Sequence, residues 1–126
     1  MFLVDSSGSI KETDPYDWDR VLQFLNEAIL GLNSLGDMRF SVVLFSHEAH
    51  LQFNLDRFTN VNQVVNEVAS AFYVGGTTDI TAGLQLIRNE VVPKARPDAA
   101  KIIILLSDGK PNEQVQYINL DSFKLQ

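Results

Sequence analysis

Residues 2–9 read FLVDSSGS, an apolar triplet that runs directly into a carboxylate and a stretch of serines and glycine. The triplet predicts a short buried strand, and the small polar residues after it predict a loop at the end of that strand. Further on, Asp14 as N-cap and Pro15 at the first helical position predict the start of a helix. A strand, a polar loop and a helix in this order form a βα unit, which is typical of mainly parallel sheets.

The rest of the chain continues the alternation of strands and helices. Apolar residues recur at helical spacing in residues 14–35, 61–72 and 80–91, with Asn60 as a cap for the second helix and Pro93 ending the third. Strands are predicted at 39–46, which is apolar enough to be central, at 49–55, which alternates like an edge strand, and at 101–106, KIIILL. The pattern predicts an α/β fold, a three-layer, doubly wound and mainly parallel sheet with helices on both faces.

Composition narrows the classes of function. The chain has 126 residues, which suits one domain, and no cysteine, which excludes thiol catalysis, disulfides and cysteine-ligated zinc. Its net charge of −6, without a Lys/Arg cluster, argues against a nucleic-acid partner. No apolar run approaches the roughly 20 residues that span a bilayer, so no membrane insertion by this segment is expected.

Polar residues follow the predicted strands where ligands bind in open α/β sheets, beyond the carboxyl ends. Asp5 to Ser9 follow the first strand and Ser107 to Gly109 the last, while the loop from Gly75 to Asp79 precedes a helix. If that loop lies at the same rim, two carboxylates and several hydroxyls face one another. These hard oxygen donors suit Mg²⁺, Mn²⁺ or Ca²⁺ and not Zn²⁺ or Cu²⁺, and the many neutral hydroxyls favour Mg²⁺.

Three sequence elements also resemble a known site. DSSGS at 5–9, GGTTDIT at 75–81 and SDGKP at 107–111 resemble, in order, the elements of the metal-ion-dependent adhesion site of von Willebrand factor type A domains and integrin inserted domains. The resemblance covers nearly the whole chain. It implies that Ser7, Ser9 and a threonine are direct or near-direct metal ligands, and that Asp5 and Asp108 bind directly or through water.

The resemblance leaves two candidates for the threonine. Thr78 precedes Leu84 by six residues, which is the spacing from the family's threonine to its first buried helix position, whereas Thr77 follows the Gly-Gly pair more as the threonine of other family members does. Thr78 is the preferred ligand. Asp79 is expected to cap the following helix, His47 and His50 to be solvated without a role, and Tyr16 and Trp18 to pack rather than bind a ligand.

The resemblance implies a function as well. It points to a metal-dependent, non-enzymatic binding module of the extracellular matrix or cell surface, which ligates an acidic residue of a protein partner through the cation. One alternative is an intracellular scaffold subunit of a multiprotein complex. Another is a Mg²⁺-dependent phosphotransfer or hydrolytic enzyme using Asp5, although the sequence has no P-loop, no GxGxxG and no Lys or Arg beside Asp5.

The length of the chain departs from the family. Domains of the family continue after the third element with a helix, further strands and a last helix, whereas this sequence ends at residue 126. We therefore expect residues 1–126 to form a single partial domain of a larger protein, with the last strands and helices missing. The apolar strand 101–106 would have an unpaired edge, which predicts poor stability and aggregation.

Overall fold

In the computed structural model of the chain, residues 1–8 and 16–106 are described. They contain one four-stranded sheet with the order β3-β2-β1-β4. The strands are β1 (Phe2–Asp5), β2 (Val42–Phe45), β3 (Ala49–Phe53) and β4 (Ile104–Leu106). β1 runs parallel to both of its neighbours, and β3 pairs with β2 in the antiparallel sense. The predicted central strand and the predicted edge strand are thus confirmed as β2 and β3.

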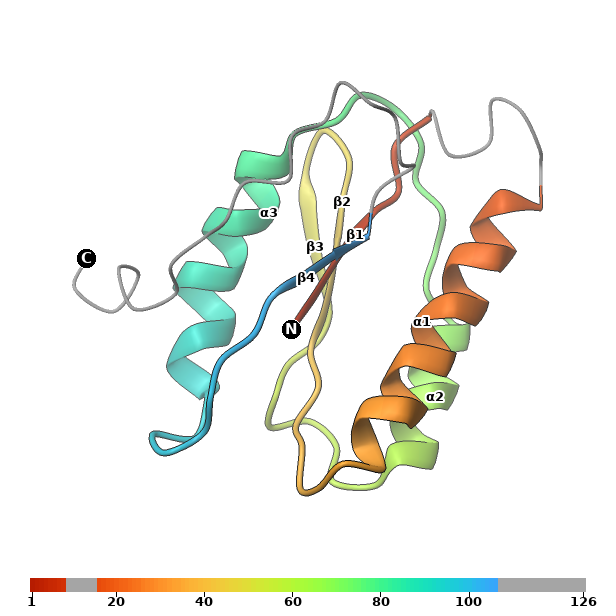
Figure 1. The fold of residues 1–126 in the computed structure, drawn as a ribbon. Helices are drawn as coiled ribbons and strands as arrows, with labels where there is room; N and C mark the ends of the chain where they lie inside the picture. The colour runs from red at the N-terminus through yellow and green to blue at the C-terminus, as the bar shows by residue number, and fades with distance from the viewer. Residues whose placement is uncertain (9–15, 107–126) are drawn as a thin grey trace.

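Helices cover both faces of this sheet, as the three-layer prediction requires. They are α1 (Asp17–Asn33), α2 (Val61–Ala69) and α3 (Ile80–Leu86), which continues through a π-helical turn, η2 (Ile87–Val91), and a 3-10 turn, η3 (Val92–Lys94). In Figure 1, α3 lies on one side of the strands, and α1 and α2 lie together on the other. None of the helices within the described ranges is long and apolar enough to span a membrane.

The two faces of β1 have separate apolar cores because successive side chains of a strand point in opposite directions. Phe2 and Val4 pack with the helices α1 and α2, in a cluster that includes Leu25 and Val68. Leu3 belongs to the other cluster, which reaches η2. All four residues of β1 and all four of β2 are buried, so these two strands form the rigid centre of the sheet.

Two local predictions differ from the structure, and a third, the start of the first helix, falls on Asp14 and Pro15, which lie outside the described residues. The described part of α1 begins at Asp17, with Tyr16 as an N-cap that makes no side-chain capping hydrogen bond. Phe72 was predicted in the helical stripe but is 78% exposed, because α2 ends at Ala69 and the chain after it is not helical. β4 is only three residues long and half-buried, because only Phe2 to Val4 of β1 pair with it.

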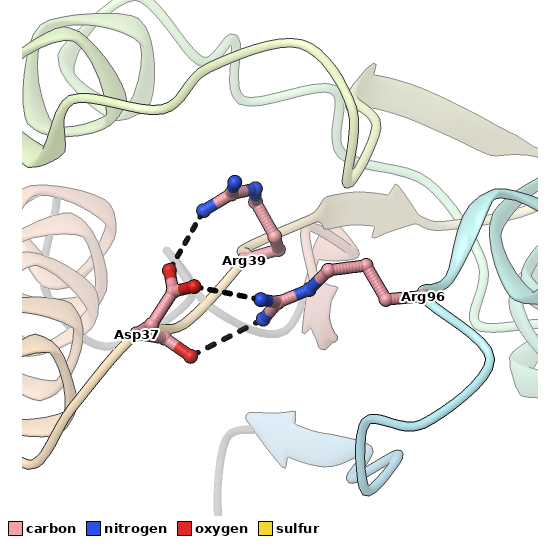
Figure 2. A network of polar contacts seen from close by, with 3 residues as sticks. All are labelled: Asp37, Arg39 and Arg96. Atoms are coloured by element: carbon pink, nitrogen blue, oxygen red, sulfur yellow. Dashed lines mark hydrogen bonds and ion pairs between the residues drawn. The ribbon is translucent and has the colours of Figure 1, made fainter.

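An ion-pair cluster lies near the amino end of β2. The Asp37 carboxylate accepts from Arg39 Nη1 and Arg96 Nη1, both at 2.9 Å, and the Asp37 carbonyl accepts from Arg96 Nη2 at 3.2 Å (Figure 2). Asp37 follows α1, whereas Arg96 follows η3. The cluster therefore ties together segments that come from helices on opposite faces of the sheet.

Candidate metal centre

The first polar loop is anchored to β2 at the carboxyl end of β1. Asp5 is the last residue of β1 and pairs with Phe45. The next residue, Ser6, donates to the Phe45 carbonyl twice, from its amide at 2.8 Å and from its hydroxyl at 3.1 Å. Asp5, Ser6 and Ser7 are all buried. A rigid neighbouring strand thus sets the direction in which this polar segment leaves the sheet.

Only one of the two oxygens of the Asp5 carboxylate has a hydrogen-bond partner among the described residues. Its Oδ1 accepts from the Ser7 amide at 2.8 Å, so the orientation of the side chain is fixed by its own loop. Its Oδ2 is buried and has no hydrogen-bond partner among the described residues, and the residue is 0% exposed. Buried polar atoms in folded proteins nearly always have a partner, and an ionised group left without one is costly. An unpartnered carboxylate oxygen of this kind is a place where a cation fits.

The second polar loop docks directly on the first. The Gly75 amide donates to the Ser6 carbonyl, and the Gly8 amide donates to the Gly76 carbonyl, both at 2.8 Å. Both loop glycines have positive φ, +80° at Gly75 and +91° at Gly76, which L side chains rarely adopt. A Cβ on Gly8 would lie 3.3 Å from the Gly76 oxygen, so the two backbones approach closely. These contacts place the two loops at the same rim.

The end of the second loop is fixed to the sheet through Asp79. Its amide donates to the Ser46 carbonyl at 2.6 Å, and its side chain accepts from the Ala82 amide at 3.2 Å as the N-cap of α3. The expectation that Asp79 is a cap is therefore confirmed. Thr77 and Thr78 lie between these anchors and are both exposed. Thr78 as the ligand stays a prediction.

Two of the five predicted ligands, Ser9 and Asp108, lie outside the described residues. The last described strand, β4, ends at Leu106, which pairs with Val4, the residue before Asp5. Within the described ranges, no three histidine, cysteine or acidic side chains gather as a metal-binding group. The donors that the structure brings together are therefore one carboxylate and the hydroxyl-bearing loops.

Two further side chains contact these loops and were not predicted to do so. The Tyr73 hydroxyl donates to the Ser7 carbonyl at 2.9 Å. The exposed His47 has its Nδ1 3.3 Å from the position that a Cβ on Gly76 would take. Tyr73 precedes the Gly-Gly pair by two residues, which was a partial indication in the sequence that it lies near the second loop. No feature of the sequence indicated that His47 lies near that loop.

The family profile described as von Willebrand factor type A domain matches residues 1–122. The chain belongs to this family. The type A assignment agrees with the α/β sheet described above, and it confirms the resemblance that rested on the three polar elements.

Curated relatives of this type A domain are much longer proteins. The chain is 31% identical over 119 residues to the collagen alpha-6(VI) chain of Mus musculus, a match that covers 92% of this chain and 5% of that protein. It is 27% identical over 113 residues to integrin alpha-X of Mus musculus, covering 87% of this chain and 9% of that protein. The chain thus spans a small part of either relative.

A solved structure resembles this type A domain in both fold and sequence. It is proximal thread matrix protein 1 from the mussel byssus, with a TM-score of 0.76 and 27% identity, and the match covers 88% of this chain and 28% of that one. In that protein the metal-ion-dependent adhesion site is occupied by zinc. A divalent cation thus occupies this site in a protein of similar fold, and the preference of the present chain for Mg²⁺ stays a prediction.

Proposed function

We propose that this chain is a binding module of the extracellular matrix or cell surface that captures an acidic residue of a protein partner through a divalent cation. The residues that would hold the cation are Asp5, Ser7 and Thr78, together with Ser9 and Asp108. Collagen VI and integrin relatives and the metal-bearing mussel protein support this class of function.

The observation that carries the proposal is the buried, unpartnered Oδ2 of Asp5. Burying a charged group is costly unless it is paired, and a cation supplies the missing partner. The amide of Ser7 holds the other carboxylate oxygen, so the side chain is oriented before any ion arrives. The docked Gly75–Gly76 segment brings the threonines to the same rim.

Magnesium is the cation that we propose. Mg²⁺ binds oxygen donors, uses few carboxylates and keeps several waters, which matches a donor set of hydroxyls and two aspartates. When bound, the ion supplies a coordination place that a carboxylate from outside the chain can take. If Asp5 or Asp108 binds through water, the ion keeps more of its charge for that carboxylate.

Calorimetric titration of the full chain with MgCl₂ tests the cation site. The wild type is expected to bind with a Kd of about 1 mM or tighter, in the range of weak extracellular modules. Asp5→Asn keeps an oxygen that accepts from Ser7 but removes the charge, and we expect it to lose about tenfold or more in affinity. Asp56→Asn is the matched control because Asp56 is exposed and lies after β3. A wild type without binding at millimolar Mg²⁺ would refute the proposal.

The acidic-partner part of the proposal needs a second probe. Glutarate carries the carboxylate group of an acidic side chain, and glutaramide has the same length without the charge. We expect glutarate to shift the NMR signals of the Ser6–Gly8 segment only when Mg²⁺ is present, and glutaramide to leave them unchanged. Equal shifts with and without Mg²⁺ would show that carboxylate binding does not use the ion.

A further inference from the structure

Tyr73 contacts both loops of the candidate metal centre. It lies between the end of α2 and the Gly75–Gly76 pair. Its hydroxyl donates to the Ser7 carbonyl at 2.9 Å, from a residue 66 positions away in sequence. Its ring also lies under the second loop, because a Cβ on Gly75 would be 3.7 Å from Tyr73 Cε1. One half-buried side chain therefore supports two loops at once.

The contact with Ser7 restrains the segment that bears the predicted ligands. The Ser7 amide is already used by Asp5 Oδ1 at 2.8 Å. With its carbonyl bonded to Tyr73, the backbone of Ser7 is held on both sides. Holding both peptide groups limits the directions in which the Ser7 side chain can leave the backbone. Such support from outside the ligand set commonly changes metal affinity.

The Tyr73 ring also packs near Trp18 of α1. Its centroid lies 5.6 Å from that of Trp18, and the two rings are tilted by 53°. Trp18 is buried in the first turn of α1, and its Nε1 donates to the Ala71 carbonyl at 3.4 Å. Trp18 is also the single tryptophan of the chain. Its fluorescence therefore reports on one known position, next to Tyr73.

We propose that Tyr73 is a positioning residue for the cation site, which fixes Ser7 through its hydroxyl and links cation binding to the environment of Trp18 through its ring. This inference rests on the proposed function, since it presupposes a cation at the rim. The link is reciprocal: whatever loosens the Tyr73–Ser7 contact weakens cation binding, and cation binding tightens that contact.

The test compares Tyr73→Phe with a matched variant in the full chain. Tyr73→Phe keeps the ring and removes one hydroxyl that donates to a backbone carbonyl. Ser34→Ala also removes a hydroxyl that donates to a backbone carbonyl, that of Gly31 at 2.6 Å, but at the other end of α1. The measurements are the Kd for Mg²⁺ by calorimetry, the Trp18 emission during the same titration, and the melting temperature in EDTA.

We expect Tyr73→Phe to weaken Mg²⁺ binding about threefold to tenfold, the effect of one lost hydrogen bond. Ser34→Ala should bind Mg²⁺ as the wild type does. In the wild type, Trp18 emission should change with Mg²⁺ at the same half-saturation that calorimetry gives. This last measurement needs no variant, so a constant emission would overturn the link to Trp18 even if Tyr73→Phe does not fold.

Two results would overturn the inference while leaving the proposed function intact. One is a Tyr73→Phe variant that binds Mg²⁺ within twofold of the wild type. The other is a wild type that binds Mg²⁺ by calorimetry while its Trp18 emission stays constant at saturation. A wild type that does not bind Mg²⁺ at all refutes the proposed function, and the inference falls with it.

Discussion

Gly83 of α3 lies directly against Leu3 of β1. A Cβ on Gly83 would come within 2.5 Å of Leu3 Cδ1 and 3.3 Å of Phe45 Cβ. The helix that follows the second polar loop therefore packs on the two central strands without an intervening side chain. Because Asp79 caps the same helix, the seating of α3 also sets where the second loop ends.

Gly83→Ala is expected to destabilise the fold. The added methyl requires the buried Leu3 side chain or α3 itself to shift. Overpacking of a tight core typically costs about 1–3 kcal/mol, against about 0.5–1 kcal/mol that helix propensity returns. Gly31→Ala in α1 is the matched control, since a Cβ there meets nothing within 4 Å. That change should stabilise the protein by about 0.5–1 kcal/mol through helix propensity. Urea unfolding of both variants measures the difference, and effects of equal sign would contradict the packing described for Gly83.

Asp5→Asn is expected to change stability with opposite signs in EDTA and in Mg²⁺. In EDTA, replacing the buried carboxylate by a neutral amide relieves an uncompensated charge, with a gain on the order of 1 kcal/mol. In Mg²⁺ at 100 times the wild-type Kd, the wild type gains about 2.7 kcal/mol from binding, whereas a variant that binds tenfold more weakly gains only about 1.4 kcal/mol. Thermal melts should therefore show the variant to be more stable than the wild type in EDTA and less stable in Mg²⁺. A variant that is less stable than the wild type in EDTA would argue against a strained Asp5.

Several features of this rim and of the helices near it could be predicted from the sequence because local residue patterns determine them. The apolar triplet before Asp5 predicted β1, and Asn60 was correctly predicted as a cap, since its side chain accepts from the Asn62 amide at 2.8 Å. The rule that ligands gather beyond the carboxyl ends of strands left open whether the Gly75 segment lies at the same rim as Ser6. The hydrogen bond between those two residues shows that it does.

The remaining features depend on tertiary contacts that no local pattern encodes. Phe72 continued the apolar spacing of α2, but the helix ends at Ala69, and Phe72 is left exposed. Tyr73 and Gly83 gain their roles only from what packs against them, Ser7 in one case and Leu3 in the other. Helix ends and cross-element contacts are thus what sequence periodicity leaves undetermined.

The choice between the two threonines can be tested directly. Thr78→Val keeps the shape of the side chain and removes the hydroxyl, so we expect a loss of about tenfold or more in Mg²⁺ affinity. Thr77→Val should stay within about twofold of the wild type, because Thr77 is not the proposed ligand. Both residues are exposed in the loop between Gly76 and Asp79, so neither change opens a cavity. Calorimetry that gives the reverse order would assign the ligand to Thr77.

Arg96→Ala is expected to cost more stability than Lys94→Ala. Arg96 bonds both the carboxylate and the carbonyl of Asp37 (Figure 2), whereas Lys94 makes one long contact of 3.8 Å with Asp56. Exposed single ion pairs contribute about 0–1 kcal/mol, with the upper end reserved for good geometry. We expect about 0.5–1 kcal/mol for Arg96 and a value near zero for Lys94 by urea unfolding. High salt should reduce the Arg96 effect, and an effect that is insensitive to salt would mean that packing of the side chain is responsible.

Ile102→Lys is expected to reduce self-association of the chain. β4 is the last strand in the sheet order, so among residues 1–8 and 16–106 only β1 pairs with it, and Ile102 just before it is 59% exposed. An apolar strand whose second edge is paired by no described residue can pair with another molecule, and a lysine opposes such pairing. Light scattering at concentrations on the order of tens of micromolar should show association of the wild type that the variant lacks. Leu35→Lys is the control, because Leu35 is 75% exposed but lies after α1, away from any strand edge. A wild type that stays monomeric and melts in one sharp transition would show that the edge of β4 does not cause self-association.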